Sequence, residues 1–208
     1  MALKKMEEWA QEGTRFPQLV FGPEGCGKTT WLKQSAVLLR ELAFDVVYLN
    51  PLEEVSYAEL DVPDVKRRLL ELIRDMKDKA WARWASALVA LVRDAISREG
   101  RFAVLVDDVF QAIGRGEAAK YVKALLGLIE YPPRSIDAVV VVVATSEGVT
   151  RREIGRHKWA NHRPMCNMPR DGLRELYDQL PGEKPPFEDV RKTTGGNPHL
   201  LGQLYKAK

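Results

Sequence analysis

One short stretch restricts the fold of this chain more than any other feature: GPEGCGKT at residues 22–29. It fits the pattern G-x-x-x-x-G-K-[ST] in full. A short apolar run at 18–21 precedes it, and apolar residues at helical spacing follow it over 28–42. This order predicts a strand, then a glycine-rich loop, then a helix that begins where the loop ends.

The chemistry of this stretch suits a bound phosphate chain. Glycines let successive backbone N–H groups converge on phosphate oxygens without side-chain clashes. Because the next helix begins at Lys28, the positive end of its dipole also faces the anion. We expect Lys28 to reach the β- and γ-phosphates and the Thr29 hydroxyl to bind Mg²⁺. The residues predicted here to bind nucleotide are Gly22, Pro23, Glu24, Gly25, Cys26, Gly27, Lys28, Thr29 and Thr30.

Cys26 lies at a variable position of this loop and has two interpretations. It is either a redox-sensitive thiol at a helix N-terminus or a residue that fills the loop and is covered when nucleotide binds. The surrounding sequence offers no evident resolving thiol, which favours the second interpretation.

Strands and helices alternate along the first three quarters of the chain. Continuous apolar runs, as at 102–108 and 137–146, are typical of parallel strands that are covered on both faces. Helical crossovers between such strands predict an α/β fold, a three-layer αβα core around a parallel central sheet. We expect this core over residues 1–148, followed over 149–208 by a basic connecting segment and a small C-terminal helical lid. Expected strands are 18–21, 45–50, 102–108 and 137–146, and expected helices are 28–42, 64–100 (one helix or two) and 116–131.

Composition excludes several classes of protein. The 208 residues are 45% hydrophobic and 29% charged, which is typical of a globular chain, and the net charge of +3 does not by itself indicate a nucleic-acid-binding protein. The two cysteines are too few for a disulfide framework. The longest apolar run, 138–144, is much shorter than a membrane helix requires. We therefore expect a cytoplasmic protein without membrane contact.

Two adjacent acids end the apolar strand at 102–108. We expect the first, Asp107, to bind Mg²⁺ together with Thr29. Asp108 either orients or deprotonates the water that attacks the γ-phosphate, or only ends the strand and caps the following helix. Thr145, at the end of the next apolar run, has two similar interpretations: a polar catalytic side chain near the γ-phosphate or a simple turn residue.

Four motifs together resemble a known family: GPEGCGKTTWL, VLVDDVF, VVVATSEGVTRREI and TGGNPHLL. In this order they resemble the archaeal ATPase branch of the STAND nucleotide triphosphatases, relatives of AAA+ and origin-recognition ATPases, and VLVDDV is also similar to NB-ARC domains. The resemblance covers about residues 5 to 205. It implies an adenine nucleotide with Mg²⁺, ATP hydrolysis and a conformational switch read by a protein partner or by self-association. It also implies that Pro198 lies near the nucleotide.

One departure from the family pattern concerns catalysis. Asp108 stands where many hydrolysing relatives carry glutamate, and its carboxylate is one methylene shorter. We therefore expect slow hydrolysis. Two alternatives remain: a P-loop kinase that phosphorylates a small acceptor, and a scaffold that holds ADP or ATP without hydrolysis. The basic segment at 151–170 has three interpretations: a nucleic-acid contact, a set of arginines that senses a neighbouring molecule, or a solvated loop.

Overall fold

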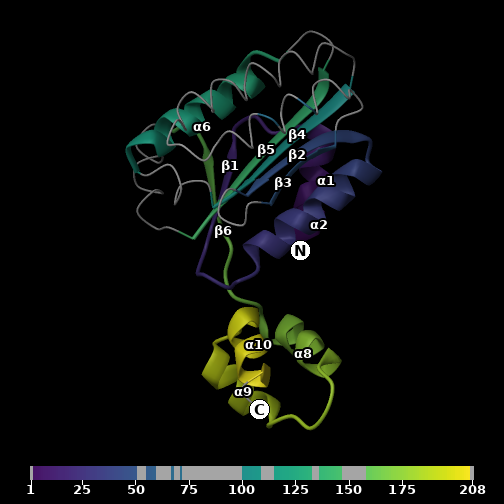
Figure 1. Ribbon diagram of the computed structural model, residues 1–208, viewed down its shortest axis with the longest axis vertical. Coiled ribbons are helices and arrows are strands. Elements are labelled where there is room, and N and C mark those ends of the chain that lie inside the picture. Colours follow the sequence, from purple (N-terminus) through teal and green to yellow (C-terminus); the bar gives the residue numbers. More distant parts are fainter. Residues whose placement is uncertain are drawn as a thin grey trace.

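The computed structural model describes residues 2–50, 55–59, 67, 71, 100–108, 115–132, 136–146 and 158–206. Its centre is a six-stranded sheet in the order β3-β2-β4-β5-β1-β6 (Figure 1). The strands are β1 (Gln18–Phe21), β2 (Phe44–Asn50), β3 (Val55–Glu59), β4 (Gly100–Asp107), β5 (Ile136–Thr145) and β6 (Asn161–Pro164). Five of them run parallel, and only β3 pairs antiparallel, with β2.

Helices cover both faces of this sheet, so the predicted three-layer α/β architecture is confirmed. The helices α1 (Ala2–Glu12) and α2 (Lys28–Glu41) lie on one face, and α6 (Arg115–Glu130) lies on the other (Figure 1). The α2 helix forms because Trp31, Leu32, Ala36 and Leu39 recur at helical spacing and turn one apolar face to the sheet. That face joins α1 and the central strands in one continuous hydrophobic core.

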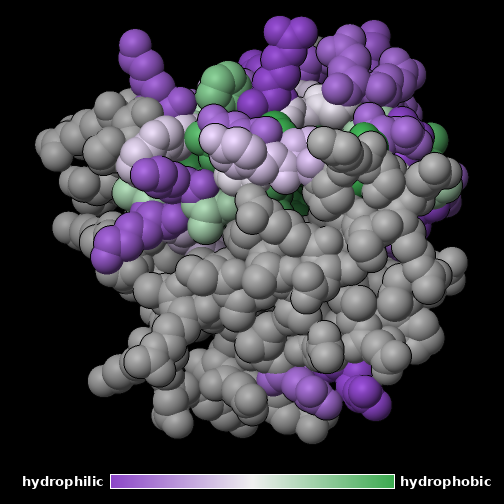
Figure 2. All heavy atoms as spheres, turned by 90° about the horizontal axis from the view of Figure 1, so that it is seen from above, coloured by the Kyte–Doolittle hydropathy of each residue, from purple (hydrophilic) through white to green (hydrophobic). Residues whose placement is uncertain are grey.

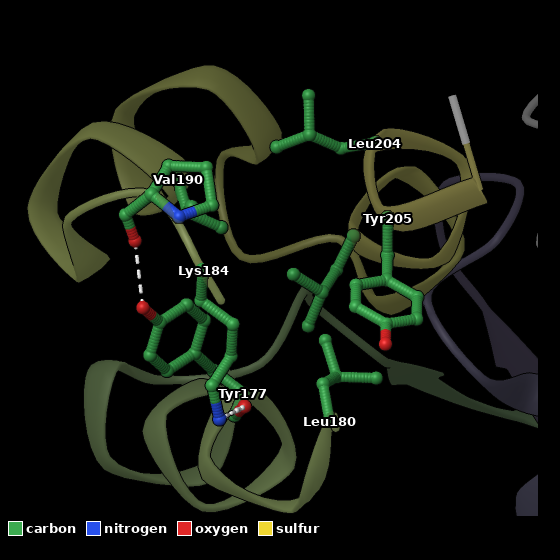
Figure 3. Close-up of a pocket in the computed structure, with 8 residues that line it drawn as sticks. Tyr177, Leu180, Lys184, Val190, Leu204 and Tyr205 are labelled. Carbon is green, nitrogen blue, oxygen red and sulfur yellow. Dashed lines mark hydrogen bonds between the residues drawn. The ribbon is translucent and has the colours of Figure 1, made fainter. Parts of the chain in front are cut away.

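A second, smaller core lies among the last three helices, α8 (Arg170–Gln179), α9 (Phe187–Thr194) and α10 (Pro198–Lys206). Tyr177 and Phe187 pack edge to face at its centre, with ring centroids 5.4 Å apart. The Tyr177 hydroxyl donates to the Pro185 carbonyl, and Lys184 Nζ donates to the Tyr177 carbonyl, beside a small pocket (Figure 3). None of the residues that line this pocket is a predicted nucleotide ligand.

Two short strands were not predicted from the sequence. β6 lies inside the segment that we expected to be an irregular connection, because its four residues, Asn-His-Arg-Pro, carry no apolar alternation. It is nevertheless paired with β1 along its whole length, from Gln18↔Asn161 to Phe21↔Pro164. β3 follows β2 as an antiparallel edge strand. The sheet therefore extends beyond the strands that carry an apolar signature.

The expected helical region at 64–100 lies outside the described residues, except for two helical residues, Arg67 and Glu71, and for Gly100, which begins β4. No helix in the described part of the chain is long and apolar enough to cross a membrane. Figure 2 views the molecule from the end opposite α8, α9 and α10, and the described residues visible there are mainly hydrophilic.

Candidate nucleotide site

The glycine-rich loop at 22–27 connects β1 to α2 at the end of the sheet that faces α10 (Figure 1). Gly27 precedes the helix with φ 101°, a left-handed conformation that glycine adopts without strain. The first N–H groups of α2, which directly follow the loop, have no intrahelical partner, as at any helix start. Such a loop is suited to bind an anion.

Lys28 is buried, and its ammonium group lies inside this loop. Its Nζ donates to the carbonyl oxygens of Gly22 at 3.0 Å and Pro23 at 2.9 Å, and it lies 3.9 Å from Cys26 Sγ. The loop therefore curves around the ammonium group and holds it through these two carbonyls. Thr29 and Thr30 follow on the first turn of α2.

Two glycines of the loop are required by close neighbours. A side-chain Cβ at Gly22 would lie 2.0 Å from the carbonyl oxygen of Met165, the residue after β6. A Cβ at Gly25 would lie 2.6 Å from His199 Cβ and 2.8 Å from Asn197 Oδ1. The loop is therefore packed against the segment after β6 on one side and against the start of α10 on the other.

Strand register brings the predicted acid Asp107 to the same edge of the sheet. Phe21, the last residue of β1, is paired with Thr145 of β5, and Ala144 of β5 is paired with Asp107 of β4. The carboxyl ends of these three neighbouring parallel strands therefore meet where the loop begins. Thr145 and Asp107 are both fully buried there.

The Asp107 carboxylate is oriented by two side chains of β2. Tyr48 Oη donates to Asp107 Oδ2 at 3.2 Å, and Asn50 Nδ2 donates to the same oxygen at 3.4 Å. Both donors are buried at the end of β2 next to β4. Sequence reasoning missed Tyr48 and Asn50, although a tyrosine and an asparagine at the end of an otherwise apolar strand were a usable signal.

Asp108 has an unusual backbone and a defined partner. Its φ is 46°, in the left-handed region that only a few non-glycine residues adopt. Its backbone N–H donates to the Ala144 carbonyl at 3.0 Å. Its Oδ1 accepts from both the N–H and the hydroxyl of Ser146, each at 3.2 Å. The carboxylate thus links the end of β4 to the end of β5, beside Asp107.

The cluster of helices α8, α9 and α10 is hydrogen-bonded to the loop through the side chain of Asn197. Asn197 Nδ2 donates to the Glu24 carbonyl at 2.9 Å, and Asn197 Oδ1 accepts from the N–H groups of His199 at 3.0 Å and Leu200 at 3.2 Å. Asn197 is therefore the N-cap of α10 and a direct contact of the glycine-rich loop. Pro198, which was predicted to lie near the nucleotide, directly follows Asn197 in the chain. The contact made by Asn197 was not predicted.

The basic segment 151–170 divides into parts with different environments. Residues 151–157 lie outside the described residues. Arg163 Nε donates to Gln18 Oε1 at 3.2 Å, and Arg170 donates to Glu188 from Nε at 3.1 Å and from Nη2 at 2.7 Å. The adjacent guanidinium of Arg170 holds the pKa of the Glu188 carboxyl below its usual value. Two of the basic side chains considered as nucleic-acid contacts therefore form hydrogen bonds to other side chains of the chain.

Together, the parallel sheet, the glycine-rich loop and the strand-end acids define a P-loop α/β protein with the fold of AAA+ ATPases. The chain belongs to a family of ATPase domains found predominantly in Archaea, whose family model matches residues 1–204. This confirms the resemblance to archaeal ATPases noted from the sequence. No curated protein matches the chain.

Several solved structures share the fold at low sequence identity. The chain is similar to Aeropyrum pernix ORC1 in complex with DNA, with a TM-score of 0.60, 14% identity and coverage of 98% of this chain and 57% of that one. It is also similar to AMPPCP-bound DnaA from Aquifex aeolicus, with a TM-score of 0.56, 13% identity and coverage of 98% of this chain and 58% of that one. For Aeropyrum pernix ORC2 with ADPNP and ADP, the TM-score is 0.51 at 17% identity, and the match covers 86% of this chain and 50% of that one. The chain thus spans between half and three fifths of the length of these proteins.

Proposed function

We propose that this chain binds ATP with Mg²⁺, hydrolyses it slowly and changes conformation with the nucleotide state. One observation carries the proposal: strand register brings the glycine-rich loop, Thr145 and Asp107 to one edge of the sheet. Phosphoryl transfer in P-loop proteins needs this combination of a phosphate cradle, a lysine and a strand-end carboxylate near the metal. The similar ORC2 structure is a complex with ADPNP and ADP, and the similar DnaA structure is bound to AMPPCP, which supports adenine as the base.

The loop residues would bind the phosphates in this proposal. Backbone N–H groups of 22–27 and the start of α2 would contact the oxygens, Thr30 the α-phosphate, and Lys28 the β- and γ-phosphates. Lys28 would exchange its present bonds to the Gly22 and Pro23 carbonyls for bonds to phosphate. Since that ammonium is buried within the loop, the phosphate would interact with it in a water-poor environment, which strengthens the attraction.

The Thr29 hydroxyl and the Asp107 carboxylate would be the protein ligands of the metal. Mg²⁺ uses one or two protein oxygens together with substrate phosphates, so one hydroxyl and one carboxylate suit it. The bonds from Tyr48 and Asn50 leave the Asp107 carboxylate with a fixed orientation, which a metal ligand needs. Within the described ranges, no cluster of three or more His, Cys, Asp or Glu residues forms another candidate metal site.

Asp108 and Thr145 would act on the reacting groups. Asp108 would orient the attacking water, and buried Thr145 would hydrogen-bond near the γ-phosphate. The two bonds from Ser146 to Asp108 Oδ1 occupy one oxygen of the proposed base. This arrangement supports slow rather than fast hydrolysis. It also favours a second candidate function, a nucleotide-binding switch that does not hydrolyse ATP.

The switch would pass from the loop to the C-terminal helices. Asn197 and Pro198 begin α10 directly at the loop, so movement of the loop on phosphate binding would displace α10. We propose a division into a core at 1–148 and a connecting segment with lid at 149–208, in which β6 is the part of the connecting segment that pairs with the core. A protein partner or a second copy would read the lid position. Nucleic acid is proposed as a ligand of 151–170, in line with the DNA in the similar ORC1 structure. We propose a cytoplasmic location.

Calorimetric ATP binding and phosphate release by the Lys28→Ala variant test the proposal. We expect this variant to lose measurable ATP affinity, because the phosphates lose the cation inside the loop. Lys33→Ala is the matched control, since Lys33 lies on the exposed side of the same helix, and it should bind ATP like the wild type. Wild-type affinity in Lys28→Ala would contradict the site. Binding without phosphate release in the wild type would favour the non-hydrolysing switch.

A further inference from the structure

The two cysteines of the chain, far apart in sequence, lie close together at the glycine-rich loop. Cys26 is inside the loop, and its Sγ contacts the carbonyl oxygen of Met165 at 3.6 Å. Cys166 is joined to that same carbonyl group by its peptide bond. Cys26 is buried and Cys166 is exposed, and both are free thiols. The residue after the carbonyl group that Cys26 contacts therefore carries a second thiol, which the local sequence around Cys26 did not reveal.

Backbone contacts hold Cys166 in this place. The Met165 N–H donates to the Phe21 carbonyl at 2.8 Å, which extends the pairing of β6 with β1 by one residue. A Cβ at Gly22 would lie 2.0 Å from the Met165 oxygen and 3.2 Å from Cys26 Sγ. The Gly22 backbone, the Met165 carbonyl and the Cys26 thiol are therefore packed closely together. A disulfide forms only when its two α-carbons come within about 7 Å of each other. Cys166 follows the carbonyl group that Cys26 Sγ contacts, and its side chain is exposed, so a dissolved disulfide can reach it.

We propose that Cys26 and Cys166 form a thiol modification site that a low-molecular-weight disulfide converts into an intramolecular disulfide. The exposed Cys166 thiolate attacks one sulfur of oxidised glutathione, breaks its S–S bond and releases one glutathione thiolate, which takes up a proton. The Cys26 thiolate then attacks the Cys166 sulfur of the mixed disulfide and releases the second glutathione. Two protein thiols are oxidised, and one glutathione disulfide is reduced to two glutathione thiols.

The crosslink would act on the loop and on the helical cluster together. Lys28 Nζ lies 3.9 Å from Cys26 Sγ, so the sulfur that changes its bonding is next to the proposed phosphate-binding cation. The segment after Cys166 is bonded to the glycines that precede α10, with Asn167 Nδ2 donating to the Gly195 carbonyl at 3.1 Å. The Met168 N–H donates to the Gly196 carbonyl at 2.9 Å. A disulfide would therefore fix the loop to the segment that carries the lid and prevent its adjustment around phosphate.

The experiment treats the whole chain with oxidised glutathione, maps its disulfides by mass spectrometry without reduction and measures ATP affinity. We expect a 26–166 crosslink and a loss of affinity of about tenfold or more, reversed by dithiothreitol. Cys166→Ser should bind ATP like the untreated wild type and keep that affinity after treatment. The mapping needs no nucleotide, so it tests the thiol site even if the proposed ATP site fails.

Two results would overturn the proposal. One is a glutathione adduct on Cys166 with the Cys26 thiol still free after prolonged treatment, because the second exchange step would then not occur. The other is a complete 26–166 crosslink that leaves ATP affinity unchanged. Cys26→Ser serves as the mapping control: it should stop at the glutathione adduct on Cys166, which shows that the crosslink uses the loop thiol.

Discussion

The Asn197 side chain donates a hydrogen bond to the Glu24 carbonyl at 2.9 Å and so joins the start of α10 to the glycine-rich loop. The same side chain caps α10 through its oxygen, which accepts from His199 and Leu200. One buried amide therefore fixes both the helix end and its distance from the loop. Since the Glu24 carbonyl belongs to the segment that would surround phosphate, any rearrangement of this segment changes a contact that α10 depends on.

Replacement of Asn197 by aspartate separates these two roles. Aspartate is as good an N-cap as asparagine, so the helix start is kept, but its carboxylate cannot donate to Glu24 and repels that carbonyl oxygen. We expect Asn197→Asp to retain the fold and to raise hydrogen exchange of the loop amides at 22–27. Asn197→Ala should also lose the cap, at a cost of about 1 kcal/mol in unfolding free energy. Unchanged loop exchange in both variants would show that the contact does not restrain the loop.

Alanine at Gly25 should disrupt the same interface by steric conflict. Its Cβ would lie within 2.8 Å of the Asn197 and His199 side chains, and the backbone φ of 76° is unfavourable for alanine. We expect ATP affinity to fall by about tenfold or more. Gly127→Ala on α6 is the matched control, because nothing lies within 4 Å of its Cβ position. That variant should keep ATP affinity and raise the melting temperature slightly, since alanine favours a helix. Equal ATP affinities in the two variants would contradict the predicted conflict.

The parts of the site that could be predicted from the sequence are those that a local pattern of neighbouring residues marks. The loop at 22–29 and Asp107 were predicted because a motif and an apolar strand mark them locally. Tyr48 and Asn50 were not, because their role depends on the pairing of β2 with β4, which brings distant residues together. β6 was missed because its sequence carries no apolar alternation, and only its pairing with β1 reveals a strand.

The hydrogen bond between the lid and the loop was not predicted from the sequence. The resemblance implies that Pro198 lies near the nucleotide, which stays a prediction, and the neighbouring Asn197 makes the bond to the loop. An asparagine before a helix is a common cap, so the sequence explained its presence without reference to the loop. The proximity of Cys26 and Cys166 was likewise beyond sequence reasoning, because it depends on the register of β6 against β1.

Asp107→Asn should weaken Mg²⁺-dependent ATP binding more than Mg²⁺-free binding, because the metal uses the carboxylate charge. Tyr48→Phe keeps that charge and removes one donor to it, so we expect a smaller loss of Mg²⁺-dependent affinity and about 1 kcal/mol lower unfolding free energy. Tyr131→Phe is the control, since Tyr131 is 69% exposed. Titrations with and without Mg²⁺ measure the effect. Equal losses under both conditions would indicate a structural role for Asp107.

Variants of Asp108 distinguish an ATPase from a non-hydrolysing switch. The positive φ of Asp108 makes asparagine the most informative replacement. Asparagine adopts the left-handed region more readily than most residues and can still accept from Ser146, so Asp108→Asn should preserve both the φ of 46° and this contact. If the carboxylate orients water, ATP binding will be unchanged and phosphate release will fall about 10²-fold. Glutamate has a longer carboxylate but tolerates a positive φ poorly, so Asp108→Glu must be judged on melting temperature together with rate.

Ser146→Ala completes this comparison, because it removes the hydroxyl that bonds Asp108 Oδ1 and leaves the backbone N–H bond in place. If that hydroxyl holds the carboxylate away from the water, phosphate release should increase in Ser146→Ala, and the increase should disappear in the Ser146→Ala, Asp108→Asn double variant. Single-turnover phosphate release at saturating ATP measures both effects without interference from product release. We expect slow hydrolysis in the wild type that depends on Asp108. An unchanged rate in Asp108→Asn would assign Asp108 to capping the end of β5 and exclude it from catalysis.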